Sequence, residues 1–133
     1  MSVLGNTTLK FSEEQAMILD TAREFCRDKS PVSAVREQLD TELGYDTGTW
    51  DEMVSLGWAG IALPEAYGGS GLGISALVPV VESMGRALLS TPLVSTALAA
   101  QMILRGGNTE QAERLLPDLA SGTTATPALL ENA

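Results

Sequence analysis

The stretch with the strongest appearance of a binding motif is the loop IALPEAYGGSGLGI, in which four of the six residues from 68 to 73 are glycine. Gly71, Gly73 and Ala76 match the G-x-G-x-x-A pattern of a dinucleotide-binding turn. Pro64 and Glu65, however, separate the preceding apolar run from the turn, and residues 93–101 lack the acidic residue that such sites place about twenty positions on. The context therefore favours a turn whose glycines permit positive φ angles and close helix packing.

Few other side chains offer chemistry. The chain has no histidine and one cysteine, so it cannot build a Ser-His-Asp or Cys-His nucleophile, a histidine zinc site or a thiolate cluster. Carboxylates and hydroxyls remain. Glu82 precedes Arg86 by four residues, which predicts an ion pair on a helix surface, and Glu65 follows Pro64 in the glycine loop. We assign neither glutamate as a catalytic base, and we predict no metal site.

Composition limits the possible partners. The 133 residues carry a net charge of -9 and are 44% hydrophobic, as expected for one folded domain. The negative charge disfavours nucleic acid and acidic membrane surfaces as partners. Cys26, without a second cysteine to pair with, suits a reducing compartment, and we expect a buried thiol in a cytoplasmic protein. The N-terminus does not resemble a signal peptide, and Pro92 with its neighbours interrupts the apolar run 87–104, which predicts a buried helix.

The elements that must position these residues are helices. Apolar residues recur at helical spacing, and cap, proline and glycine signals divide the chain into six helices. The predicted spans are about 12–29, 30–39, 49–57, 75–89, 91–106 and 108–122.

Particular residues set these predicted boundaries. Ser12 and Gln15 form a capping-box pattern, and Ser30, Thr49 and Ser75 are expected to cap the second, third and fourth helices. Pro79 falls within a first turn, and Pro117 is expected to break or kink the last helix. The fold class is therefore an all-α bundle of about six helices.

Three segments follow from this reading. Residues 1–10 form an N-terminal tail, 11–122 the helical domain, and 123–133 an extended, threonine-rich stretch. We interpret the last stretch as a linker or the first strand of a following β domain.

In order, the segments FSEEQ, AREFC, LGWAGIALPEAYGGSGLG and LLPDLASG resemble the N-terminal helical domain of flavin-dependent acyl-CoA dehydrogenases, over residues 11–122. The resemblance implies α,β-dehydrogenation of an acyl-CoA thioester, in which a glutamate base takes the α-proton and FAD accepts the β-hydride. It also implies a middle β domain and a C-terminal helical domain that hold most of the FAD site and the base. This chain alone is then expected to be inactive and not to hold FAD.

The same resemblance places Val94, Ser95 and Leu98 against the acyl chain, and the glycine loop beside the acyl pocket as a connector between the third and fourth helices. An ordinary core role for these three residues stays open. Family members resembling the GRALLSTPLV segment act on bulky or unusual acyl groups and include heteromeric enzymes. Expected partners are acyl-CoA and the remaining domains or a partner subunit, in a homo- or hetero-oligomer. The alternative is a non-catalytic helical association module or a split subunit.

Overall fold

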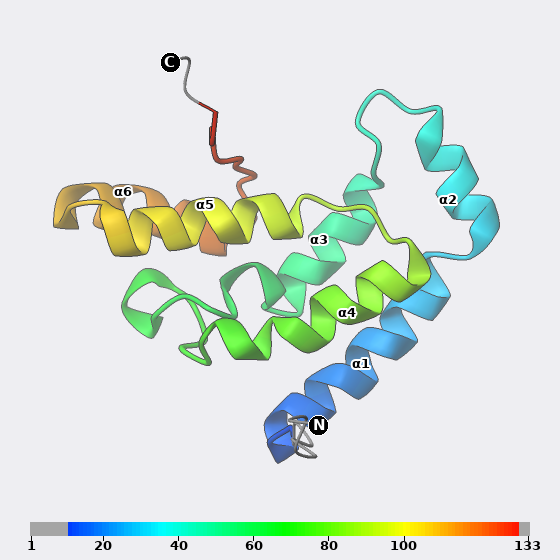
Figure 1. Ribbon diagram of the computed structural model, residues 1–133, viewed down its shortest axis with the longest axis horizontal. Helices are drawn as coiled ribbons and strands as arrows, with labels where there is room; N and C mark the ends of the chain where they lie inside the picture. Colours follow the sequence, from blue (N-terminus) through cyan, green and yellow to red (C-terminus); the bar gives the residue numbers. More distant parts are fainter. Residues whose placement is uncertain (1–10, 131–133) are drawn as a thin grey trace, which may run out of the picture.

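The protein is described by a computed structural model that covers residues 11–130, and six α-helices account for most of it (Figure 1). The predicted N-terminal tail, 1–10, lies outside the described residues. The helices are α1 (Glu13–Lys29), α2 (Val32–Leu39), α3 (Thr47–Ser55), α4 (Val78–Ala87), α5 (Leu93–Gly106) and α6 (Thr109–Ala120). Three short 3-10 helices, η1 (Trp58–Gly60), η2 (Glu65–Tyr67) and η3 (Ile74–Ala76), connect α3 to α4. Because residues 11–130 contain no strand, the all-α prediction is confirmed.

Two helices begin with a complete capping box. The Ser12 Oγ accepts the Gln15 amide at 3.1 Å, while the Gln15 side chain accepts the Ser12 amide, as the sequence predicted for α1. Asn108 and Gln111 do the same for α6. Each box satisfies amides that a helix start otherwise leaves without partners, which fixes where the helix begins.

The first core lies between α1 and α4, which run side by side in the same direction. At one end Gln15 Nε2 donates to Ser75 Oγ at 3.3 Å, and at the other Ser30 Oγ donates to the Ala87 carbonyl at 2.9 Å. Between these ends, Cys26 and Val80 are fully buried. The core continues through aromatic residues, with Phe25 meeting Trp58 edge to face at a centroid distance of 5.2 Å.

The second core lies where α5 and α6 pack as an antiparallel pair (Figure 1). Its buried members are Leu63, Ala100, Ala112, Leu116 and Leu119. Two hydrogen bonds tie the end of the chain to this part: Trp50 Nε1 donates to the Gly122 carbonyl at 3.0 Å, and the Ala125 amide donates to Thr96 Oγ1 at 3.1 Å. Residues 123–130 are held in this way without forming a helix or a strand.

Two predicted caps are wrong for a common reason: the side chain serves another contact. Ser30 reaches across to α4, and Pro31 takes the cap position of α2 without a side-chain bond. Ser75 sits inside η3 and accepts from Gln15, so α4 begins later, at Val78.

The third helix, α3, begins earlier than predicted. Asp46 is its cap, and its Oδ2 accepts the Thr49 amide at 2.7 Å and the Thr49 hydroxyl at 2.9 Å. Thr49 is therefore inside the first turn and buried. The glycine at position 48 suggested a loop, but an aspartate cap outweighs one glycine in a first turn.

Pro117 does not break the last helix, since α6 continues through it to Ala120. The proline removes the amide that would bond to the Glu113 carbonyl. Both residues are exposed, so water can satisfy that carbonyl. Pro79, by contrast, lies in the first turn of α4 as predicted.

The Asp46 cap predicts a pH-dependent loss of stability. The Thr49 amide and hydroxyl bonds hold the pKa of Asp46 below its ordinary value of 3.8. A lowered folded-state pKa means that the cap stabilises fully above pH 3.8 and weakens as pH falls through the folded-state value. We expect Asp46→Ala to lower the free energy of unfolding by about 1 kcal/mol at pH 7, and by less at pH 3. Urea unfolding at both values measures this; Asp46→Asn, which keeps an acceptor, should lose little at pH 7, and equal losses for both variants would contradict the assignment.

Candidate functional site

The glycine loop is a backbone scaffold and leaves no phosphate cradle. All five amides from residue 68 to 72 donate to backbone carbonyls of residues 60–65. Among them, the Ser70 amide bonds to the Gly60 carbonyl at 3.0 Å and the Gly71 amide to the Leu63 carbonyl at 2.8 Å. A phosphate turn needs free amides directed at its ligand. The prediction that this loop is a structural turn is therefore confirmed.

The glycines are needed because two backbones touch. A Cβ placed on Gly69 would overlap the Leu63 carbonyl and lie 2.6 Å from the Gly60 carbonyl oxygen. A Cβ on Gly60 would lie 3.2 Å from the Gly69 Cα. Gly68, Gly71 and Gly73 adopt positive φ angles between 67° and 82°, which side chains disfavour. The loop thus folds back on η1 and fixes the segment that separates the two cores.

The helix α5 presents an apolar stripe to solvent. Val94 is 42% exposed and Leu98 is 49% exposed, one helical turn apart on the same face. Ser95 is half-buried beside them, and its hydroxyl donates to the Pro92 carbonyl at 3.1 Å. The structure therefore brings the three predicted residues together at the edge of the bundle, where a ligand or another protein segment can touch them.

Sequence reasoning missed one member of this stripe. Met102 is 49% exposed and extends the face by one more turn, although its apolar type suggested a core position. The spacing 94, 98, 102 was a sufficient signal, because i, i+4 and i+8 always share a helix face. The buried side of α5 is formed instead by Leu93, Thr96, Ala99 and Ala100.

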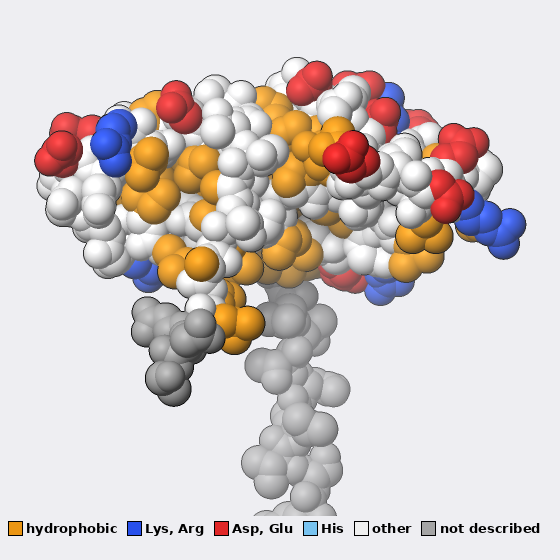
Figure 2. Space-filling view, turned by 90° about the horizontal axis from the view of Figure 1, so that it is seen from above, with side chains coloured by type: hydrophobic (Ala, Val, Ile, Leu, Met, Phe, Trp, Pro, Cys, Tyr) orange, Lys and Arg blue, Asp and Glu red, His pale blue; other side chains and the backbone are white. Residues whose placement is uncertain are grey.

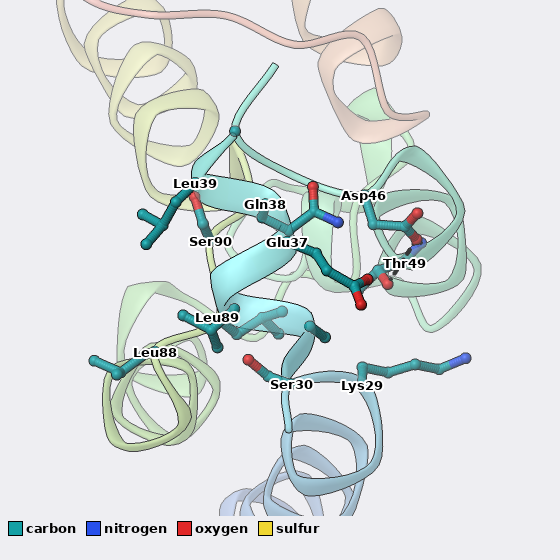
Figure 3. A pocket seen from close by; sticks show the side chains of 13 residues that line it. Lys29, Ser30, Glu37, Gln38, Leu39, Asp46, Thr49, Leu88, Leu89 and Ser90 are labelled. Carbon is teal, nitrogen blue, oxygen red and sulfur yellow. Dashed lines mark hydrogen bonds between the residues drawn. The ribbon is translucent and has the colours of Figure 1, made fainter. Parts of the chain in front are cut away.

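A cavity of about 440 Å³ lies where α2 stands away from the ends of α1 and α4 (Figure 3). Leu39, Leu88 and Leu89 line one side of it, and Glu37, Asp46 and Thr49 line the other. No local sequence pattern predicts this cavity, because its walls come from four separate elements.

A smaller apolar groove of about 280 Å³ runs along the outer face of α4 and η3, past Ile74, Val78 and Val81. Glu82 also lines it and pairs with Arg86 at 3.0 Å, which confirms the predicted ion pair. That pair is exposed and contributes little to stability.

The surroundings of two titratable groups, Cys26 and Lys29, bear on the chemistry open to this domain. Burial raises the pKa of the Cys26 thiol to about 11, which keeps it protonated and unreactive, as expected of a core cysteine. Lys29 is engaged with Glu52 at 2.6 Å. Figure 2 shows acidic side chains toward both ends of one face with few basic ones between, in keeping with the net charge of -9.

None of the helices between residues 11 and 130 combines the length and the hydrophobicity needed to cross a lipid bilayer.

Comparison with known proteins gives consistent matches over most of the chain. A family model described as "Acyl-CoA dehydrogenase, N-terminal domain" matches residues 12–123. Acyl-CoA dehydrogenase IpdE2 of Mycolicibacterium smegmatis is 34% identical over 84% of this chain and 36% of its own length. Mitochondrial isovaleryl-CoA dehydrogenase of Pongo abelii is 34% identical over 84% of this chain and 27% of its own.

Solved structures agree with the sequence matches. A variant of the Tcur3481-Tcur3483 steroid ACAD superimposes with a TM-score of 0.77 at 36% identity, over 83% of this chain and 30% of that one. The chain thus spans about a third of the length of the proteins it matches.

The backbone contact in the glycine loop predicts opposite effects at two glycines. Gly69→Ala should lower the free energy of unfolding by about 2 to 3 kcal/mol, because the new Cβ meets rigid backbone. Gly85→Ala, inside α4 with nothing within 4 Å of its Cβ, should be neutral or raise it by up to about 1 kcal/mol. Chemical denaturation of both variants measures the difference. Equal stability of the two would show that the loop does not need its glycine.

Proposed function

Because the chain belongs to the acyl-CoA dehydrogenase family, we propose that it forms the N-terminal, substrate-pocket domain of an FAD-dependent enzyme that dehydrogenates an acyl-CoA thioester between Cα and Cβ. The observation that carries this proposal is the apolar stripe of Val94, Leu98 and Met102, which are 42 to 49% exposed on one face of α5. An apolar helix face of this kind calls for a covering group, and an acyl chain together with adjoining domains would supply it.

Val94, Ser95 and Leu98 are proposed to contact the acyl chain. Val94 and Leu98 supply a hydrophobic surface one turn long, and Ser95 keeps the adjacent space open because its side chain is small and bonded back to Pro92. These residues would bind the acyl group, orient it and exclude water around it. None of them has a group that can take a proton at neutral pH.

The cofactor and the base are proposed to lie in other parts of the complete enzyme. When bound, FAD supplies the acceptor for the β-hydride. The glycine loop does not fit the flavin pyrophosphate, since its amides are consumed within the loop. Glu82 is exposed and paired with Arg86, so we do not propose it as the base.

The substrate is proposed to be bulky. The structural neighbour at 36% identity is described as a steroid ACAD, and small side chains at Ser95 and Ala97 leave room beside the stripe. That neighbour is named as a pair of proteins, which supports a partner subunit for this chain as well. The second candidate function, an association module without catalysis, rests on the same stripe, which another protein could cover.

The isolated 133-residue chain is expected to fold but not to oxidise acyl-CoA. The amides of its glycine loop are used by backbone carbonyls, and its Glu82 is paired with Arg86, so we propose that the flavin site and the base come from the rest of the enzyme. Reduction of an electron-accepting dye, measured with FAD and a panel of acyl-CoA thioesters, checks this. Turnover comparable to that of a complete family member would refute the division of labour proposed above. If adding the adjoining domains restores turnover, the chain is a domain of an enzyme. If it does not, the association module is favoured.

Ser95→Trp in the complete enzyme should shift substrate preference from long to short acyl groups. The indole would fill the space beside Val94 and Leu98, so a long chain loses the burial of about three methylenes at roughly 0.8 kcal/mol each. The total of about 2.4 kcal/mol corresponds to about a fifty-fold fall in kcat/KM for long relative to short substrates. The measurement is kcat/KM across a series of acyl lengths.

The control for an added surface indole is Glu113→Trp, on the exposed side of α6. Melting temperatures distinguish the two roles of Ser95. If Ser95 belongs only to the core, Ser95→Trp overpacks the bundle and lowers stability without changing the preference. That outcome would count against the pocket assignment.

A further inference from the structure

We infer that the cavity between α2 and the ends of α1 and α4 receives the far end of the acyl group, and that this end is a bulky ring system with an uncharged hydrogen-bonding group. The inference rests on the proposed function, because it extends the site on α5. The cavity volume of about 440 Å³ falls within the range of roughly 300 to 1,000 Å³ that is usual for small-molecule sites.

The cavity lies close to the start of the α5 stripe. Ser90 lines the cavity, and Val94, the first residue of the stripe, follows four positions later. Consecutive Cα atoms are 3.8 Å apart, so the two residues are separated by no more than about 15 Å. An acyl group lying along Met102, Leu98 and Val94 would approach the cavity with the end remote from the thioester.

The apolar side of the cavity is unusual in its exposure. Leu39 is 78% exposed and Leu88 is 69% exposed, and both stand on the same side of the cavity in Figure 3. Leu88 also has a φ of 55°, the one positive φ at a non-glycine residue among residues 11–130. This conformation ends α4, with the Leu88 amide donating to the Gly85 carbonyl at 3.3 Å, and it turns the Leu88 side chain out beside the cavity. A hydrocarbon ring placed here would cover both side chains.

The polar side of the cavity selects the charge of the ligand. Lys29 is already bound to Glu52, and Asp46 Oδ2 is occupied by Thr49. The carboxylate of Glu37 and the Nε2 of Gln38 remain along the wall, since Gln38 Oε1 accepts the Thr41 hydroxyl at 3.4 Å. The carboxylates of Glu37 and Asp46 would repel an anion, whereas a hydroxyl can donate to Glu37 and accept from Gln38 Nε2. The wall therefore disfavours an anionic ligand end and is complementary to one that carries a hydroxyl group.

Substrate preference tests this inference in the complete enzyme. Ser90→Trp, which places an indole at the cavity wall, should lower the kcat/KM ratio of a hydroxylated four-ring acyl-CoA to butyryl-CoA by at least about tenfold, since the ring loses its burial. Ser33→Trp is the matched control: it is exposed on α2 but does not line the cavity, and its ratio should stay as in the parent. Equal ratios for the two variants would overturn the inference.

A second variant isolates the polar contact. Gln38→Leu keeps the size of the side chain and removes its hydrogen-bonding groups, so the preference for a hydroxylated ring over its deoxygenated analogue should fall several-fold. If Gln38→Leu changes kcat/KM by the same factor for both ring substrates, the polar wall does not contact the ligand.

Binding to the 133-residue chain separates failure of this inference from failure of the proposed function. Amide chemical shifts are followed by NMR during titration with testosterone, a neutral hydroxylated ring compound without CoA. Shifts should concentrate at Gln38, Leu88 and Ser90 and disappear in Ser90→Trp. Shifts confined to the groove near Val78, or no shifts, would overturn the cavity assignment. Failure of the complete enzyme to oxidise any acyl-CoA would refute the proposed function and leave this binding result to stand alone.

Discussion

The contact between the backbones at Gly60 and Gly69 is the constraint on which both cores depend. It is possible only because neither residue carries a side chain, and the surrounding amides complete it with hydrogen bonds to carbonyls of residues 60–65. Trp58 and Ile61 point into the first core, while Leu63, two positions later, belongs to the second. A displaced loop would therefore disturb α4 and α5 together, and with them the stripe and the cavity wall. The glycines of this loop match a dinucleotide-binding pattern, but their role here is to let two backbone segments pack closely.

Sequence patterns predicted the fold well because helix periodicity and caps are local. The capping box at Ser12 and the proline in the first turn of α4 needed no knowledge of tertiary structure. The predicted caps at Ser30 and Ser75 failed because their hydroxyls bond to residues 57 and 60 positions away, and such partners leave no local trace. Val94 and Leu98 were predicted through family resemblance; both are exposed on one face of α5, and their contact with an acyl chain stays a prediction. The cavity beside α2 could not be predicted, since its shape depends on how far α2 stands from its neighbours.

The stripe and the cavity would contribute to ligand binding in different ways. The stripe is generic hydrophobic surface, and its contribution to binding scales with the apolar area that is covered. The cavity combines exposed leucines with carboxylate and amide groups in fixed positions, so its contribution depends on the position and charge of the ligand's polar atoms. A site that joins both would hold many acyl groups weakly and discriminate among them at one end. Variation of α2 could then change selectivity while the rest of the bundle stays constant.

The pairing of α1 with α4 has a consequence for how the protein is made. The contacts at the two ends of this pair join residues 60 and 57 positions apart. At about 5 to 20 residues per second, a ribosome needs roughly 3 to 12 s to synthesise the partner of α1 after α1 itself. During that interval the face carrying Ala22 and Cys26 has no native surface to cover it. The inner face of α1 therefore stays uncovered until α4 has been synthesised, and nascent chains would offer that face to chaperones before the α1–α4 pair closes.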